Sequence, residues 1–392
     1  MMESWLIEFL KGVGRLFINP LFYWSLILVL LVGYRRIRQE RLNFGSRVFD
    51  VFSEWKHTWG VALISGLIIS VFMVCIGIVF SYETFIVLSL VTIVLSLTLR
   101  FTMLSPSYTI GITYLLLLFI PAFWDQQTFV DQALFSHINF TGLAIMVGLF
   151  LIIEAILIIR NRRNDSYPSL VKGKRGGWIG QHQIKKMSLI PFFVLIPSGA
   201  LTSIEPYWPV LPVGDETFSL MLIPFLIGYD HKVRTELPNN ASKRIGRSIL
   251  LLSLLVLLLA GFSYYVPWLS LASVLIAIIG REIINYRERM INKKNQPYFY
   301  QDNLGLRVLS IIPNSPAERL GILVGEKIVK VNDIPIHSHG DFYESLQNSG
   351  SFFKIEIVDD QGEVRFLQSP FYEGEHHKLG LIFVTKPYRQ NS

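Results

Sequence analysis

Long apolar runs separated by short polar loops fill the first three quarters of this chain. Most of the runs approach the ~20 helical residues that cross a hydrocarbon core of ~30 Å. The pattern predicts about eight or nine membrane-spanning helices. Their expected positions are residues 16–34, 60–80, 85–104, 106–124, 138–159, 187–204, 217–230, 248–264 and 266–280. The seventh run is short, and Tyr264–Trp268 (YYVPW) predicts a tight turn with interfacial aromatic residues between the last two.

Charge divides the loops into two sets. Lys and Arg are concentrated in the segments Arg35–Arg41, Arg160–Lys186, Asp230–Arg247 and Arg281–Lys294. They are absent from residues 81–84, 124–137, 205–216 and 264–268. The positive-inside rule therefore predicts that the basic loops, and the tail that follows the last of them, face the cytoplasm.

Composition supports the same interpretation. Hydrophobic residues make up 51% of the 392 residues and charged residues 17%, which is typical of a polytopic membrane protein. The single cysteine, Cys75, excludes a disulfide framework. The net charge of +7 is concentrated in a few loops, so it indicates topology first and contact with an anionic inner leaflet second. No nucleic-acid partner is expected.

From about Pro297 the pattern changes to short strands, turns and one or two short helices. The expected features are a strand over Leu304–Ile312, a helix capped by Ser315 and ended by Gly321, a turn at Asn332–Asp333, a helix capped by Ser338 with Asp341, and a hairpin turn over Asp359–Gly362. The segment NSPAERLGI…GEKIVKVND (Asn314–Asp333) resembles the bacterial PDZ domain.

That resemblance implies a groove between a strand and a helix, which binds an extended peptide as an added strand. In the PDZ family, backbone amides of a hydrophobic-Gly-hydrophobic loop hold the carboxylate of the peptide. The expected architecture is an α-helical polytopic membrane domain over residues 1–294, followed by a small α+β, circularly permuted PDZ-like domain over residues 295–392.

Two segments of the tail could supply the loop of this groove. We favour the segment that follows the predicted hairpin, as in permuted PDZ domains of some bacterial membrane proteases. It contains Lys378, Leu379, Gly380, Leu381 and Ile382. The alternative segment runs directly into a strand and contains Asn303, Leu304, Gly305 and Leu306. On the helix side, Phe342 and Leu346 either line the groove or belong to the core.

Catalytic motifs are not found in the sequence. The H-E-x-x-H motif of a zinc intramembrane protease is absent. Ser198 is followed by glycine, but no predicted span contains a histidine that could serve as its base, and His57 lies at an interface. The tail histidines His337, His339, His376 and His377 lack the spacing of a structural zinc site, so solvated loop histidines are expected. We therefore predict no catalytic residue, no metal and no cofactor.

Two charged residues near the predicted spans suggest a further hypothesis. Glu154 lies within the fifth span and Arg100 near the end of the third. They could pair across helices, or Arg100 could extend to the interface, and a tail-regulated transporter or sensor is one hypothesis for such charges. A PDZ-regulated intramembrane protease using Ser198 is the other alternative.

Taken together, apolar spans, basic inner loops and one terminal PDZ-like module resemble the MinJ family of Gram-positive division-site proteins. The segments Ile18–Phe44 (INPLFYWSLILVLLVGYRRIRQERLNF) and Leu99–Ile112 (LRFTMLSPSYTIGI) also carry the resemblance. It implies a non-enzymatic adaptor at the cell membrane, enriched at septum and poles. The implied partners are a DivIVA-type scaffold, MinD and other division membrane proteins.

Overall fold

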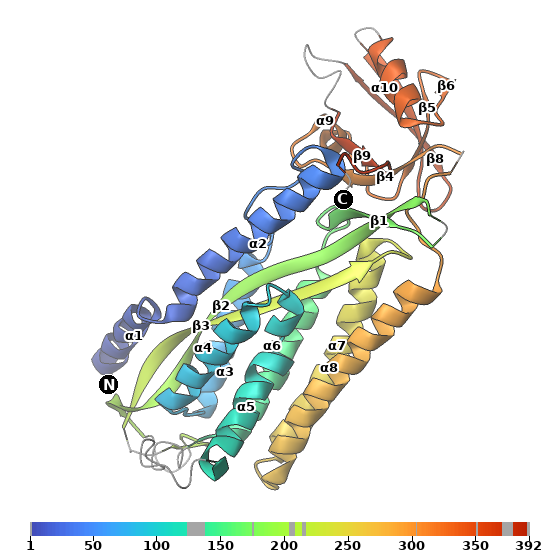
Figure 1. The fold of residues 1–392 in the computed structure, drawn as a ribbon. Helices are drawn as coiled ribbons and strands as arrows, with labels where there is room; N and C mark the ends of the chain where they lie inside the picture. The colour runs from blue at the N-terminus through green and yellow to red at the C-terminus, as the bar shows by residue number, and fades with distance from the viewer. Residues whose placement is uncertain are drawn as a thin grey trace.

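The structure is a computed structural model that describes residues 2–123, 138–174, 176–203, 208–213, 217–302, 304–349, 352–370 and 379–389. Helices and a long hairpin form an elongated bundle, and a small β-rich unit lies at one end of it (Figure 1). We call this end of the bundle the tail end. The helices of the bundle are α1 (Met2–Leu16), α2 (Pro20–Phe44), α3 (Trp59–Ile76), α4 (Tyr82–Ser96), the short 3-10 helix η1 (Phe101–Leu104), α5 (Pro106–Phe123), α6 (Phe140–Ile159), α7 (Pro238–Phe262) and α8 (Trp268–Lys294).

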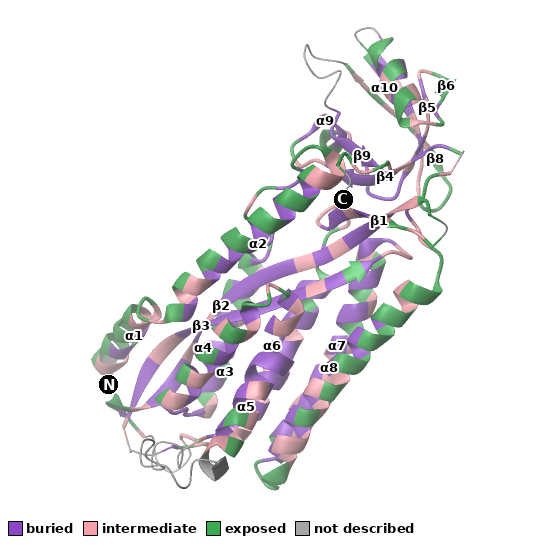
Figure 2. Cartoon of the chain, viewed as in Figure 1, coloured by how far each residue is buried: buried purple, intermediate pink, exposed green. Residues whose placement is uncertain are grey.

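Five of these helices are long and apolar enough to cross a membrane, counted over the described residues: α2, α3, α6, α7 and α8. Helices α4 and α5 are apolar but shorter. The outer face of α3 exposes a continuous aliphatic surface, with Leu63, Ile64, Leu67, Ile68 and Val71 between 54% and 67% exposed. A surface of this kind is typical of a helix that faces lipid or another protein. In contrast, α6 is largely buried at the centre of the bundle (Figure 2).

Two of the expected spans are wrong, because residues 187–202 and 217–230 form strands rather than helices. Strand β2 (Trp178–Thr202) pairs antiparallel with β3 (Thr217–Val233), and β1 (Tyr167–Lys172) pairs with the start of β2. Proline provides the physical reason. Pro191 and Pro197 would interrupt a helix in its interior. In the hairpin, Pro191 lies opposite Pro224, and at a non-hydrogen-bonded pair both prolines leave the ladder intact.

A hairpin inside an apolar bundle needs partners for its outer backbone groups, because lipid supplies none. Neighbouring segments provide them. Ser70 of α3 accepts the Phe193 N–H through its Oγ at 2.8 Å, and the Met187 N–H binds the Glu54 carbonyl at 3.1 Å. Phe80 N–H donates to the Leu195 carbonyl at 2.9 Å. The flanking helices and loops therefore satisfy edge groups that would be costly in lipid.

The suggested pairing of Glu154 with Arg100 is also wrong. Glu154 binds Arg281 at 2.6 Å, with both side chains fully buried, and Ser105 Oγ donates to the other carboxylate oxygen at 2.6 Å. Arg281 was assigned to a basic loop, but α8 continues to Lys294 and carries Arg281 inside the bundle. Arg100 lies at the start of η1 and has no ion pair among the described residues.

The β-rich unit contains a sheet in the order β8-β7-β5-β4-β9, with β6 paired to β5. Its elements are β4 (Leu306–Ile311), α9 (Pro316–Arg319), β5 (Lys327–Val331), β6 (Ile334–Pro335), α10 (His339–Gln347), β7 (Phe352–Val358), β8 (Val364–Pro370) and β9 (Leu381–Phe383).

Local features of this unit match the sequence predictions except at one residue. Gly321 is left-handed at φ +69°, and the turn residues Asn332 and Asp333 have φ of 49° and 65°. Ser338 and Asp341 form the expected reciprocal cap of α10. Ser315 makes no cap hydrogen bond, so that prediction is wrong.

Candidate functional site

The first feature of the candidate site is the outer edge of β9, which pairs with no other strand among the described residues. Strand β9 ends the sheet and pairs on one side with β4. Ile312 donates its N–H to the Gly380 carbonyl at 2.8 Å, which makes Gly380 a hydrogen-bonded position. Such positions alternate along an antiparallel pair, so Leu381 directs its own N–H and C=O away from β4. An extended peptide could pair with this edge as a further strand.

The turn into β9 requires glycine. Gly380 has φ +84°, and a Cβ at this position would lie 2.2 Å from Ser315 Cβ. The preceding carbonyl, of Leu379, accepts the Ala317 N–H at 3.0 Å. The loop is therefore fixed against the start of α9, with Leu379 and Leu381 buried in the core of the β-rich unit. Lys378 lies outside the described residues.

Helix α10 lies beside β9 and forms the other wall. Phe342 and Leu346 are both fully buried in the core cluster. Phe342 packs on Phe383 of β9 with ring centroids 5.3 Å apart. The side chains of α10 that remain accessible on this side are His339 and Tyr343, and the His339 ring lies 6.0 Å from that of Phe383. The expectation that His339 is a loop histidine is wrong, because this residue begins α10 directly after the Ser338 cap; Tyr343 was not predicted from the sequence to line the groove.

The alternative loop has a different position. Gly305 has φ +131° and leads directly into β4. β4 is flanked by β5 on one side and β9 on the other. Leu306 is already paired with Ile328 of β5. Leu304 is 74% exposed, and Asn303 lies outside the described residues.

The β-rich unit is packed against the bundle through a shared apolar cluster, which we call the docking cluster. It joins residues of both parts: Val48, Phe49, Tyr167, Leu170 and Leu237 from the bundle, and Phe299, Leu309, Val324, Ile382 and Val384 from the tail. Ile382 belongs to β9, so the candidate peptide-binding strand is itself part of this interface. Any movement of β9 is thereby linked to the bundle.

Backbone contacts reinforce the docking. Gly180 of β2 donates its N–H to the Phe299 carbonyl at 2.8 Å. A Cβ on Gly180 would lie 2.4 Å from Leu309 Cδ1. At the chain end, the Tyr388 N–H binds the Asn43 carbonyl at 3.0 Å, which ties the tail to the last turn of α2.

Comparison with known proteins identifies both parts of the chain. A PDZ-domain family model matches residues 307–357. The "Cell division topological determinant MinJ" of Bacillus subtilis (strain 168) is 34% identical over 385 residues, which cover 98% of this chain and 97% of that protein. The chain belongs to the MinJ family.

Two more distant matches differ in how much of the chain they cover. The "Probable cell division topological determinant MinJ" of Lacticaseibacillus paracasei is 19% identical over 95% of this chain and 98% of that protein. The mouse "Serine protease HTRA3" is 27% identical over 121 residues, which cover 27% of this chain and 26% of that protein. The likeness to the protease is therefore partial, whereas the MinJ-family likeness extends over the whole chain.

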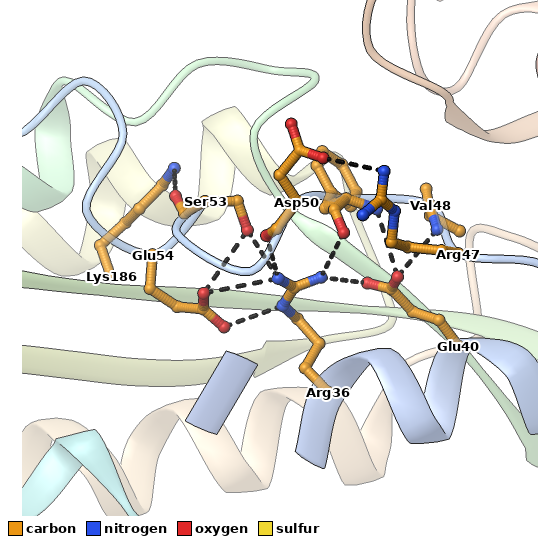
Figure 3. A network of polar contacts seen from close by, with 9 residues as sticks. Arg36, Glu40, Arg47, Val48, Asp50, Ser53, Glu54 and Lys186 are labelled. Atoms are coloured by element: carbon orange, nitrogen blue, oxygen red, sulfur yellow. Dashed lines mark hydrogen bonds and ion pairs between the residues drawn. The ribbon is translucent and has the colours of Figure 1, made fainter. Parts of the chain in front are cut away.

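A buried polar network supports the docking cluster of this MinJ-family chain (Figure 3). Arg36 of α2 donates to Glu40 at 2.6 Å and to Glu54 at 2.8 Å, and all three side chains are at most 8% exposed. The second oxygen of Glu40 accepts the N–H groups of Val48 at 2.8 Å and Phe49 at 3.2 Å. The network thus holds two residues of the docking cluster in place.

A buried histidine lies at the polar end of the hairpin, beside the same interface. His182 Nδ1 is 2.9 Å from Ser166 Oγ, and its ring lies 4.5 Å from that of Phe299. Burial without a charged partner lowers the pKa of the His182 imidazole to about 3. This side chain is therefore neutral in the folded MinJ-family protein at physiological pH.

The candidate protease residues are far apart. Thr58, next to His57, donates to the Met187 carbonyl at 3.3 Å. Ser198 lies eleven residues further along β2, which corresponds to roughly 35 Å at ~3.3 Å per strand residue. His57 instead contacts Asp165 at 3.1 Å. No group of three or more potential metal-binding side chains occurs in the described part of the chain, and His376 and His377 lie outside it.

Proposed function

We propose that this chain is a membrane-anchored, non-enzymatic adaptor that acts as a topological determinant of cell division. Residues 1–294 form the membrane unit and residues 295–392 the PDZ unit, which has a circularly permuted order because its groove strand is the last one. The observation that carries the proposal is the outer edge of β9 beside α10, which no described strand pairs and which lies at one end of an apolar bundle. An adaptor needs a membrane anchor and a site for another protein's peptide, and this chain has candidates for both.

We propose a multi-pass arrangement with the PDZ unit in the cytoplasm. The support comes from charge, because the segments at the tail end hold the basic loops. Membrane anchoring would confine the groove to a thin layer beneath the bilayer. This confinement raises its effective concentration for other membrane-bound partners.

The proposed partners are a DivIVA-type polar scaffold, MinD and other division membrane proteins, with enrichment of the chain at septum and poles. Similarity to the MinJ family supports these partners. In the groove, backbone groups of Leu381 would pair with the peptide, and the Leu379–Gly380 loop would present amides to its end. His339 and Tyr343 would contact its side chains.

The rival functions are less well supported by the geometry. A transporter or sensor would use Glu154. This carboxylate is bound by Arg281 and Ser105 in a fully buried position, which is typical of a structural ion pair. A serine protease would require His57 and Ser198 to meet, but His57 lies near Met187 and Ser198 lies eleven residues further along β2. The adaptor therefore remains the function that fits most of the observations.

The test is localisation and co-purification in a Gram-positive rod that lacks its own MinJ-family protein. Four forms are compared: the full chain, the chain ending at Asn295, the groove variant His339→Ala with Tyr343→Ala, and the neighbouring control Glu344→Ala, an exposed position of the same helix. We expect the full chain and the control to concentrate at septa and to co-purify a DivIVA-type protein or MinD. The truncated chain and the groove variant should reach the membrane but lose at least one partner.

Uniform membrane signal for the full chain, with normal division in cells that lack it, would refute the adaptor function. Partner binding that is equal in all four forms would instead place the contacts outside the groove. Melting temperatures of the purified variants show whether each PDZ unit is folded.

A further inference from the structure

A large polar cavity lies at the tail end of the bundle, separate from the peptide groove. Its volume is about 1440 Å³, and it is bounded by α2, the segment before η1, the β1–β2–β3 sheet, α8 and the linker that follows α8. The cavity exceeds the ~300–1,000 Å³ of ordinary small-molecule sites. Eleven Lys and Arg residues line it, against two acidic residues.

The two acidic residues offset only a small part of this charge, and Asp230 lies opposite Lys185 in the sheet. Glu288 is paired with Arg244 of α7, which lies outside the cavity lining, at 2.6 Å. Asp230 accepts a hydrogen bond from Gln183 at 2.7 Å. Eight of the basic residues that line the cavity are exposed and form no ion pair with any described residue: Arg35, Arg100, Lys172, Lys174, Lys232, Arg289, Lys293 and Lys294.

Secondary structure places several of these cations side by side. Alternate residues of a strand share a face, and Gln181, Gln183 and Lys185 of β2 all line the cavity, whereas His182 and Ile184 are fully buried. Lys232 of β3 is paired with Gln183. Asn292 of α8 donates to the Lys232 carbonyl at 2.7 Å, which brings the last turns of α8, with Arg289 and Lys293, next to β3.

We propose that this cavity binds a phosphate-bearing anion. Unpaired cations gathered in a concave site repel one another, and a polyanionic ligand removes that repulsion while forming charge-assisted hydrogen bonds. The ligand is either the headgroup of an anionic lipid or a soluble phosphorylated compound, because both present the same chemistry.

Position favours the lipid headgroup as the source. The cavity adjoins the ends of α2 and α8, which are both long enough to cross a membrane. About one turn before the cavity residues Arg35 and Arg289, the two helices expose large apolar side chains, including Leu31 at 47% and Tyr286 at 63%. Acyl chains could lie along these surfaces while the phosphate enters the cavity.

The experiment measures ligand binding to the purified full-length chain in detergent. One arm titrates phosphatidylglycerol in mixed micelles and follows binding by native mass spectrometry. The other titrates inorganic pyrophosphate and follows binding by calorimetry. The cavity variant carries Lys232→Gln, Arg289→Gln and Lys293→Gln. The control removes three exposed charges that do not line the cavity, with Arg38→Gln, Arg41→Gln and Arg247→Gln.

We expect the cavity variant to lose affinity about tenfold or more for at least one probe and the control about twofold or less. A charge-preserving variant with Lys232→Arg, Arg289→Lys and Lys293→Arg should keep its affinity, which separates loss of charge from loss of folding. Loss in the phosphatidylglycerol arm assigns the site to lipid, and loss in the pyrophosphate arm alone assigns it to a soluble ligand. Equal affinity of cavity variant and control for both probes overturns the proposal. None of these readouts depends on the peptide groove.

Discussion

The buried network around Arg36 offers a direct test of how the PDZ unit is held against the bundle. Replacing Arg36 by Met keeps most of the side-chain volume but leaves Glu54 without its 2.8 Å partner in a fully buried position. Glu40 retains the N–H groups of Val48 and Phe49. Breaking a buried pair by removing one member typically costs ~3–5 kcal/mol. That cost should appear as local opening of the segment that carries Val48 and Phe49.

Cysteine labelling can measure this opening. The single native cysteine, Cys75, is exposed and is first changed to Ser. Val48, which is 3% exposed, is then changed to Cys and its rate of maleimide labelling is followed. Every ~1.4 kcal/mol corresponds to a factor of ten in the opening equilibrium. Arg36→Met should therefore increase the labelling rate about 100-fold or more, provided that closing is fast relative to labelling.

The matched control removes the orphaned charge as well. With Arg36→Met and Glu54→Leu together, the Glu54 carboxylate is absent and Glu40 keeps its two backbone N–H donors. Labelling should then return to within about tenfold of the starting rate, since apolar replacement of a buried pair is often nearly neutral. The reasoning fails if Arg36→Met changes the rate less than about threefold. It also fails if the double variant labels as fast as the single one.

Three further predictions concern the interface and the bundle. Gly180→Ala places a methyl group 2.4 Å from Leu309 Cδ1 and should expose the linker between bundle and PDZ unit to limited proteolysis, whereas Gly177→Ala, with open space at its Cβ, should not. The folded pKa of His182 is depressed, so its contribution to stability is complete above pH ~6.5 and falls by ~1.4 kcal/mol per pH unit below it. By pH 5 the loss should reach about 2 kcal/mol in the unfolding free energy, and a His182→Gln chain that retained the same slope would contradict this assignment. Arg281→Met should lower the melting temperature in lipid nanodiscs, and adding Glu154→Gln should restore most of it, because the first change leaves a carboxylate buried and the second neutralises it.

The PDZ unit was predictable from sequence because its signals are local. Positive φ at Gly321 and at Asn332–Asp333, and the cap formed by Ser338 and Asp341, each depend on a few neighbouring residues. Ser315 was the exception, since its environment is set by Gly380, 65 residues away in the chain. His339 and Tyr343 were not predicted as groove residues. The spacing of side chains along α10 shows which of them share a face, but it does not show whether that face lies against the core or the groove.

The hairpin shows where hydrophobicity is insufficient. Residues 187–204 and 217–230 are apolar enough to suggest spans, and Pro191, Pro197 and Pro224 were the available signal against helices. Choosing strands required knowing that Ser70, Glu54 and Phe80 would supply partners for the edge backbone groups. Those partners come from segments more than 100 residues away.

By itself, the sequence determined that this chain contains apolar membrane-capable helices, a PDZ unit at its C-terminal end and a division of basic and non-basic loops. These properties follow from composition and from interactions between near neighbours. Only the tertiary structure decided that Arg281, rather than Arg100, pairs with Glu154, that β9 joins the docking cluster, and that unpaired cations from α2, β3 and α8 meet in one cavity. Each of these depends on the free energy of burying charges and backbone groups, which is set by what distant segments place beside them.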